Sequence, residues 1–128
     1  MADSGFSKNK RLLTAAEYGA VFSGAQFKVS CHYFLILAVC NESQNPRLGL
    51  VVAKKNIHTA VQRNRIKRQI RESFRQRMDK ASDLDLVVLV RKDADKLSNK
   101  QLAKELASLL QDLDSKLQGY NDKRSQTH

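Results

Sequence analysis

The chain has 128 residues, 41% of them hydrophobic, and its 23 Lys and Arg against 13 Asp and Glu give a formal net charge of +10. This length predicts one domain with a buried core, and the hydrophobic content excludes a wholly disordered chain. No apolar run reaches the roughly 18 residues that span a bilayer. Residues 1–10 lack the apolar stretch of a secretory signal, so we expect neither export nor membrane spanning. The charge favours a polyanionic partner, either nucleic acid or an anionic membrane surface.

Cys31 and Cys40 are the two cysteines of the sequence. Both lie in an apolar, strand-like stretch, and cysteines of a chain that is not exported are usually free, buried thiols. We therefore expect no structural disulfide and a cytoplasmic location.

A first helix is predicted to begin after Thr14. Thr14 and Glu17 have the spacing of a capping box, in which each side chain bonds the backbone of the other residue. Tyr18 and Phe22 are one turn apart on one face, and Gly24 marks the expected end. Such an aromatic pair can serve a core or a base-stacking surface, and the residues alone leave both open.

Three stretches have the composition of strands. Residues 26–40 are rich in β-branched and aromatic side chains and are long enough for two strands, or for one strand with a bend near Ser30. Turn-forming residues occupy 41–46. Residues 48–53 and 84–90 are short apolar runs, which predict largely buried strands.

A second helix is predicted between those last two strands, with Thr59 as its cap. Apolar side chains recur every four residues along it and form one stripe: Ile66, Ile70, Phe74 and Met78. At about 100° per residue, the opposite face takes in Asn64, Arg65, Lys67, Arg68, Arg71 and Arg75. We expect the stripe to pack inward and the basic face to point to solvent.

A third helix is predicted from Ser98, where Ser98 and Gln101 form a second capping box. Its apolar stripe is Leu102, Leu106, Leu109, Leu110, Leu113 and Leu117. Residues 119–128 are predicted to be a polar, frayed tail. The expected order is α-β-β-β-α-β-α, an α/β (α+β) fold in a single domain over residues 1–128, with about 6–117 structured and flexible termini.

Most of the positive charge is concentrated on the second helix and the turn before it. Residues 54–77 contain nine Lys and Arg and one acid, Glu72, a net charge of +8, and the remaining fourteen basic and twelve acidic residues give +2. A solvated helix face usually mixes signs, and only Arg68 and Glu72 have the spacing of a stabilising i, i+4 pair. Phosphates are the obvious counter-charge, because the apolar residues that would anchor a membrane are needed in the core.

Several of these motifs together resemble the protein subunit of bacterial ribonuclease P. The central helix contains Arg63-Asn64-Arg65, which matches the family's Arg-Asn-Arg signature, and it is preceded by Lys54-Lys55 and Ala60-Val61. The further matches are Lys10-Arg11-Leu12, the spacing of Tyr18 and Phe22, and the strand from Asp85 to Arg91. The resemblance spans roughly residues 6–117.

The resemblance implies an accessory subunit of an endoribonuclease that removes the 5′ leader from precursor tRNA and leaves a 5′ phosphate. The RNA partner would perform the cleavage and bind most of the required Mg²⁺, so no catalytic residue and no intrinsic cofactor are expected on the protein. We also expect no protein oligomer in the complex. The implied fold is a two-layer sandwich with a four-stranded sheet and a left-handed β-α-β crossover, similar to one domain of a ribosomal protein.

The same resemblance assigns binding roles. The implied contacts with the catalytic RNA are Arg63, Asn64, Arg65, Lys67, Arg68 and Arg71, with Lys54 and Lys55 nearby. Tyr18 and Phe22 would line a cleft for the single-stranded leader, since aromatic faces stack on unpaired bases.

Two other functions compete with this one. A protein nuclease would need a metal site, and three Asp-x-Asp pairs occur: Asp83 and Asp85, Asp93 and Asp95, and Asp112 and Asp114. They are dispersed, no Glu or His completes a cluster, and His32, His58 and His128 lack zinc-like spacing to the cysteines, so we expect no metal site. The second alternative is a ribosome-associated or general structured-RNA binding protein of the same build, which would hardly distinguish precursor from mature tRNA.

Overall fold

The computed structural model describes residues 14–40, 46–75 and 84–126. Its elements are α1 (Ala15–Gly24), β1 (Phe27–Ser30), β2 (Phe34–Cys40), β3 (Arg47–Val51), α2 (Ala60–Arg75), β4 (Leu84–Val90), the 3-10 helix η2 (Ala94–Lys96) and α3 (Asn99–Gln126). Apart from the short η2, this is the order that the sequence predicts. The stretch 26–40 forms two strands, and the Cys31 N–H donates to the Phe34 carbonyl (2.9 Å) in the turn between them.

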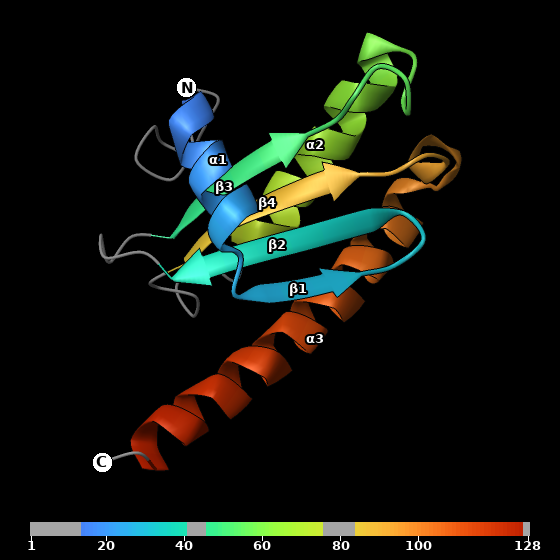
Figure 1. The fold of residues 1–128 in the computed structure, drawn as a ribbon. Helices are drawn as coiled ribbons and strands as arrows, with labels where there is room; N and C mark the ends of the chain where they lie inside the picture. Colours follow the sequence, from blue (N-terminus) through green and yellow to red (C-terminus); the bar gives the residue numbers. More distant parts are fainter. Residues whose placement is uncertain (1–13, 41–45, 76–83, 127–128) are drawn as a thin grey trace.

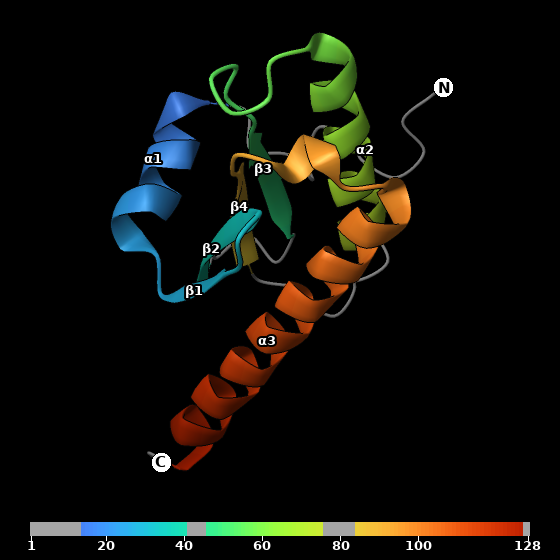
Figure 2. The same ribbon diagram turned by 90° about the vertical axis from the view of Figure 1, so that its right-hand side faces the viewer.

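The four strands form one mixed sheet in the order β1-β2-β4-β3. β1 and β4 each pair with β2 in antiparallel fashion, whereas β3 pairs with β4 in parallel. α2 and α3 cover one face of the sheet, and α1 lies on the other (Figures 1 and 2). α2 connects the parallel strands β3 and β4, so the three elements form a β-α-β unit. The two views show that its crossover is left-handed, the rare hand that the resemblance implies.

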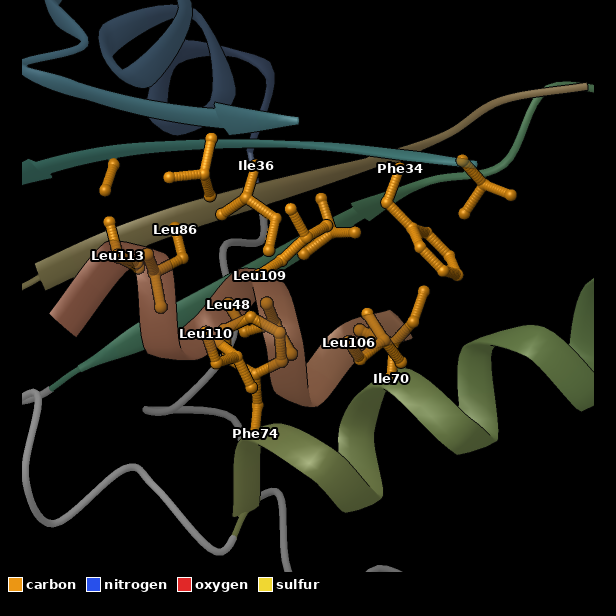
Figure 3. Packing of buried hydrophobic residues seen from close by; sticks show 14 of the residues in the cluster. Phe34, Ile36, Leu48, Ile70, Phe74, Leu86, Leu106, Leu109, Leu110 and Leu113 are labelled. Carbon is orange, nitrogen blue, oxygen red and sulfur yellow. The ribbon is translucent and has the colours of Figure 1, made fainter. Parts of the chain in front are cut away.

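The main core lies between the sheet and the two helices α2 and α3 (Figure 3). Phe34 and Ile36 of β2 face Ile70 of α2 and Leu106 and Leu109 of α3 in this core. The predicted stripe of α2 is confirmed at Ile66, Ile70 and Phe74, which are buried, while Met78 lies outside the described residues. Burying one such side chain contributes about 1.5–3 kcal/mol, so this layer supplies most of the fold's hydrophobic stabilisation.

The face under α1 is less completely covered. Val21 of α1 and Val87 of β4 form a small second cluster, and both side chains are fully buried. The side chains around them are only partly buried: Tyr18, Leu37, Val39, Val51 and Leu89. A short helix with one buried residue therefore leaves apolar sheet surface partly open to solvent.

The predicted helix caps are confirmed. The Thr14 N–H donates to Glu17 Oε1 (3.0 Å) and the Glu17 N–H to Thr14 Oγ1 (3.1 Å), which completes the capping box of α1. Ser98 and Gln101 make the same pair of bonds before α3 (2.9 and 3.1 Å). Thr59 Oγ1 accepts from the Gln62 N–H (3.2 Å) at the start of α2.

Two expectations, about the C-terminal tail and the burial of the cysteines, are wrong. α3 continues through Gly119 to Gln126, where a frayed tail was expected. One glycine costs a helix interior about 1 kcal/mol, which helix-forming neighbours offset. Cys31 and Cys40 are free as predicted, but neither is buried: Cys31 is half-buried and Cys40 is exposed. No helix in the described ranges is long and apolar enough to cross a membrane.

Candidate nucleic-acid interface

Six polar or basic side chains form a basic surface over α2 and the turn before it. On α2, Asn64 and Arg68 are exposed, and Lys67 and Arg71 are half-buried beside them. Lys54 and Lys55 are exposed in the turn that follows β3. Within the part of the chain that the structure describes, none of the six has a hydrogen-bonding or ion-pair partner. Their charges and donors are therefore available to a ligand.

The backbone of the turn that carries the two lysines is fixed. The N–H groups of Asn56 and Ile57 both donate to the Ala53 carbonyl (3.0 Å each). The Asn56 side-chain amide donates to the Val90 carbonyl (3.2 Å), and the Ile57 side chain is fully buried. The turn is thus tied to the end of β4, while its lysines remain outside.

Arg63 and Arg65 of the predicted RNA-binding set make contacts within the protein. Arg63 Nη1 donates to the carbonyls of Ile57 (2.9 Å) and His58 (3.1 Å). The expectation that Arg65 faces solvent is wrong, because its guanidinium is directed towards η2 and the start of α3. Its Nε, Nη1 and Nη2 donate to Gln62 Oε1 (2.8 Å), Asn99 Oδ1 (2.8 Å) and the Asp95 carbonyl (3.1 Å). RNA contacts by either arginine stay a prediction.

The one acid on α2 does not neutralise Arg68. Glu72 pairs with Arg75, three residues further on, and not with Arg68 as the i, i+4 spacing predicts. The pair is exposed on both sides, so it contributes little to stability. Its effect on the surface is to leave the charge of Arg68 unopposed.

The two aromatic residues of α1 lie on the other side of the sheet from α2 (Figure 2). Phe22 is 46% exposed, one of the exposed large hydrophobic side chains of the described residues. Tyr18 is half-buried, and its hydroxyl is engaged at the outer edge of β3: the Leu50 N–H donates to Tyr18 Oη (3.1 Å), and the Tyr18 O–H donates to the Leu50 carbonyl (3.4 Å). The buried residue of α1 is Val21, so the aromatic pair is not the core of this helix.

An ion network that sequence reasoning missed joins α1 to the sheet. Arg47 donates to both carboxylate oxygens of Asp85, from Nε (2.9 Å) and Nη2 (2.7 Å), and from Nη1 to Glu17 Oε2 (2.6 Å). The hydrogen bond with Asp85 raises the pKa of Arg47 above its ordinary value, and Glu17 acts in the same direction. The sequence held one signal for this network: Asp85 interrupts an aliphatic strand, and a buried carboxylate needs a cation as its partner.

The acidic pairs do not assemble into a metal site among the described residues, which contain no group of three or more His, Cys, Asp or Glu placed to hold an ion. Asp85 is bonded to Arg47, and Asp93 contacts Lys96 (3.1 Å) and His32 (3.6 Å). Asp112 and Asp114 are exposed on α3, and Asp83 lies outside the described ranges.

The protein is thus a small α+β protein with a left-handed crossover, and its basic helix face has the charge pattern of proteins that bind polyanions. The family model described as Ribonuclease P matches residues 6–114, and the chain belongs to this family.

Similar proteins agree with this assignment. The ribonuclease P protein component of Stutzerimonas stutzeri strain A1501 is 47% identical over 105 residues, which cover 82% of this chain and 80% of that protein. That of Pseudomonas aeruginosa strain PAO1 is 45% identical over 109 residues, 85% of this chain and 81% of that protein. The solved structure of the Staphylococcus aureus protein superimposes with a TM-score of 0.73 at 30% identity, covering 80% of this chain and 93% of that one. For the Thermotoga maritima protein the TM-score is 0.66 at 29% identity, with 78% and 94% covered.

Proposed function

We propose that this chain is the RNA-binding subunit of a ribonuclease P, which assists a catalytic RNA in removing the 5′ leader from precursor tRNA. The observation that carries the proposal is the basic surface of Lys54, Lys55, Asn64, Lys67, Arg68 and Arg71, exposed or half-buried and unpaired within the described residues. Family membership supplies the identity of the complex.

The basic surface would lie against the catalytic RNA. Each cation that neutralises a phosphate releases condensed counterions, which drives association and makes it dependent on salt. Helix α2 presents its cations on a rigid element, because Ile66, Ile70 and Phe74 are buried on its opposite side. A surface of this kind follows backbone shape and carries little base specificity.

The leader would bind on the face of the sheet that carries α1. Phe22 offers an exposed aromatic ring, and Tyr18, Val39 and Val51 add partly buried apolar surface around Val21 of the same helix. Unpaired bases stack on such surfaces with about 1–3 kcal/mol per base. The surfaces for the two ligands would then be on opposite faces, with the edge strand β3 and the turn of Lys54 and Lys55 between them (Figure 1).

The chemistry would belong to the RNA. The described residues bring no metal-binding cluster together, so we propose that the Mg²⁺ ions required for cleavage are held mainly by RNA. The protein would act as a single copy in the complex. The free thiols of Cys31 and Cys40 support the cytoplasm as its compartment.

The test is cleavage of a precursor tRNA at limiting Mg²⁺ with the protein alone, a bacterial ribonuclease P RNA alone, and both together. The proposal expects cleavage at the 5′ mature end only with both. It also expects the complex to bind precursor tRNA more tightly than mature tRNA. Binding of the RNA without rescue of cleavage, or equal affinity for the two tRNAs, would instead identify a general structured-RNA binding protein. Cleavage by the protein alone would place the chemistry in the protein.

A further inference from the structure

We propose that Arg63 acts in RNA binding as a positioning residue: it holds in place the turn that presents Lys54 and Lys55, and it is not itself a phosphate ligand. This inference rests on the proposed function, since it concerns how the basic surface is built. It divides the predicted RNA-binding residues into those that contact RNA and those that arrange the contacts.

The side chain of Arg63 reaches back over the start of its own helix. One nitrogen, Nη1, donates to the carbonyls of Ile57 (2.9 Å) and His58 (3.1 Å), the two residues before the cap Thr59. The Arg63 backbone N–H donates to the Thr59 carbonyl (3.0 Å), so the residue is fixed at both ends. Charge-assisted hydrogen bonds of this kind are the stronger class, and they turn Nη1 towards the backbone that precedes the helix.

The bonded carbonyls belong to the segment that joins β3 to α2. Residues 52–59 connect β3 to α2 without regular helix or strand. On the side of the sheet, the segment is held by the buried side chain of Ile57 and by the bond from the Asn56 amide to Val90 of β4. On the side of α2, the segment is held by the Thr59 hydroxyl, which accepts from the Gln62 N–H, and by the side chain of Arg63. The two adjacent lysines of the turn also repel each other. Hydrogen bonds to the carbonyls of Ile57 and His58 restrict the backbone movement that this repulsion favours.

Arg68 provides a matched control on the same helix. It has the same charge and chemistry, but it is exposed and has no partner among the described residues. If Arg63 were a phosphate ligand, its removal would behave like that of Arg68. If it positions the turn, its removal would act through Lys54 and Lys55.

The first measurement is hydrogen exchange in the free protein, for Arg63→Met and Arg68→Met. The N–H groups of Asn56 and Ile57, which close the turn on Ala53, should exchange at least several-fold faster in Arg63→Met and at the wild-type rate in Arg68→Met. Unchanged exchange in Arg63→Met would overturn the proposal. This readout needs no RNA, so it stands apart from the test of the proposed function.

The second measurement is a double-mutant cycle on affinity for a bacterial ribonuclease P RNA, with Lys54→Met/Lys55→Met as the partner variant. Arg63→Met should weaken binding in the wild-type background and have little further effect where the lysines are absent. Arg68→Met should weaken binding by the same factor in both backgrounds. The proposal would be overturned if Arg63→Met weakened binding by the same factor with and without the two lysines. Wild-type affinity in the chain that lacks both lysines would overturn it as well. Failure of the proposed function would appear separately, as unrescued cleavage with the wild-type protein.

Discussion

Arg47 and Asp85 lie opposite each other in the parallel strands β3 and β4, and two hydrogen bonds, of 2.9 and 2.7 Å, join the guanidinium to the carboxylate. Asp85 is only 5% exposed, and the guanidinium offsets the cost of burying a carboxylate there. The third bond of Arg47, to Glu17, reaches the first turn of α1. The helix that carries Phe22 is therefore attached to the sheet through charge as well as through Val21.

Replacing Arg47 with Met should destabilise the fold by about 3 kcal/mol, because it removes the guanidinium from a buried carboxylate. The free energy of unfolding in urea measures the loss. The double variant Arg47→Met/Asp85→Asn should recover part of it, since the amide carries no charge to bury. A single variant within about 0.5 kcal/mol of the wild type would show that the network does not stabilise the fold.

Replacing Tyr18 with Phe should cost about 1 kcal/mol of stability, because both hydrogen bonds with Leu50 are lost while the ring remains. Phe22→Leu is the matched comparison: as a partly exposed residue it should change stability by less than about 0.5 kcal/mol. Affinity of the assembled complex for leader-containing tRNA should fall in Phe22→Leu. Equal stability of Tyr18→Phe and the wild type would contradict the role of the hydroxyl.

Arg65 and Arg68 should respond differently to substitution by Met. Arg68→Met should keep the wild-type unfolding midpoint and lower the log–log salt slope of RNA binding by up to ~0.9 for one phosphate contact. Arg65→Met should lower the midpoint, because it removes the two hydrogen bonds that tie α2 to η2 and α3, and a third to Gln62 of the same helix. Urea unfolding followed by circular dichroism, beside a salt titration, separates the two. Identical behaviour would mean that Arg65 is not a link between helices.

The Asp93 carboxylate should titrate below its usual range. Its hydrogen bond with Lys96 lowers its pKa, with a smaller contribution from His32, and the same bond raises the pKa of Lys96. Because the folded-state pKa of Asp93 is depressed, the pair's contribution is present above the unfolded pKa and is lost as pH falls through the folded value. For Lys96 the contribution is complete below its unfolded pKa and is lost as pH rises through the raised value.

This pair can be followed by NMR titration of the Asp93 carboxyl carbon. Lys96→Met should move its pKa upwards, towards the ordinary value, and Lys100→Met should leave it unchanged. An unaltered Asp93 titration in Lys96→Met would refute the assignment. Lys96 is exposed and Asp93 is half-buried at the surface, so the change in overall stability should be small.

Much of the fold follows from local patterns. The strand Leu84–Val90 and the caps at Thr14, Thr59 and Ser98 depend on spacing along the chain, and the structure has them where the sequence predicts them. The left-handed crossover is different, since no periodicity encodes the side on which α2 returns. That feature came from the family resemblance alone.

The candidate site was less predictable, because a helical wheel uses only the residues of one helix and does not include the elements packed against it. It placed Arg65 on the solvent face, but the start of α3 lies there and supplies Asn99 as an acceptor. It paired Glu72 with Arg68, but Arg75 takes that carboxylate. The buried Asp85 could have been predicted to need a cation, but its partner Arg47 belongs to a strand 38 positions away and required the register of the sheet.

Both outer strands of the sheet have backbone groups that are already occupied by side chains. On β3 the Tyr18 hydroxyl takes the N–H and the carbonyl of Leu50, and on β1 the Lys116 ammonium donates to the Lys28 carbonyl (2.7 Å). An unprotected edge strand is a template for pairing with another chain, which leads to aggregation. At these positions an incoming strand would find its bonding partners taken. Tyr18 and Lys116 thus occupy backbone groups at which another chain could otherwise extend the sheet.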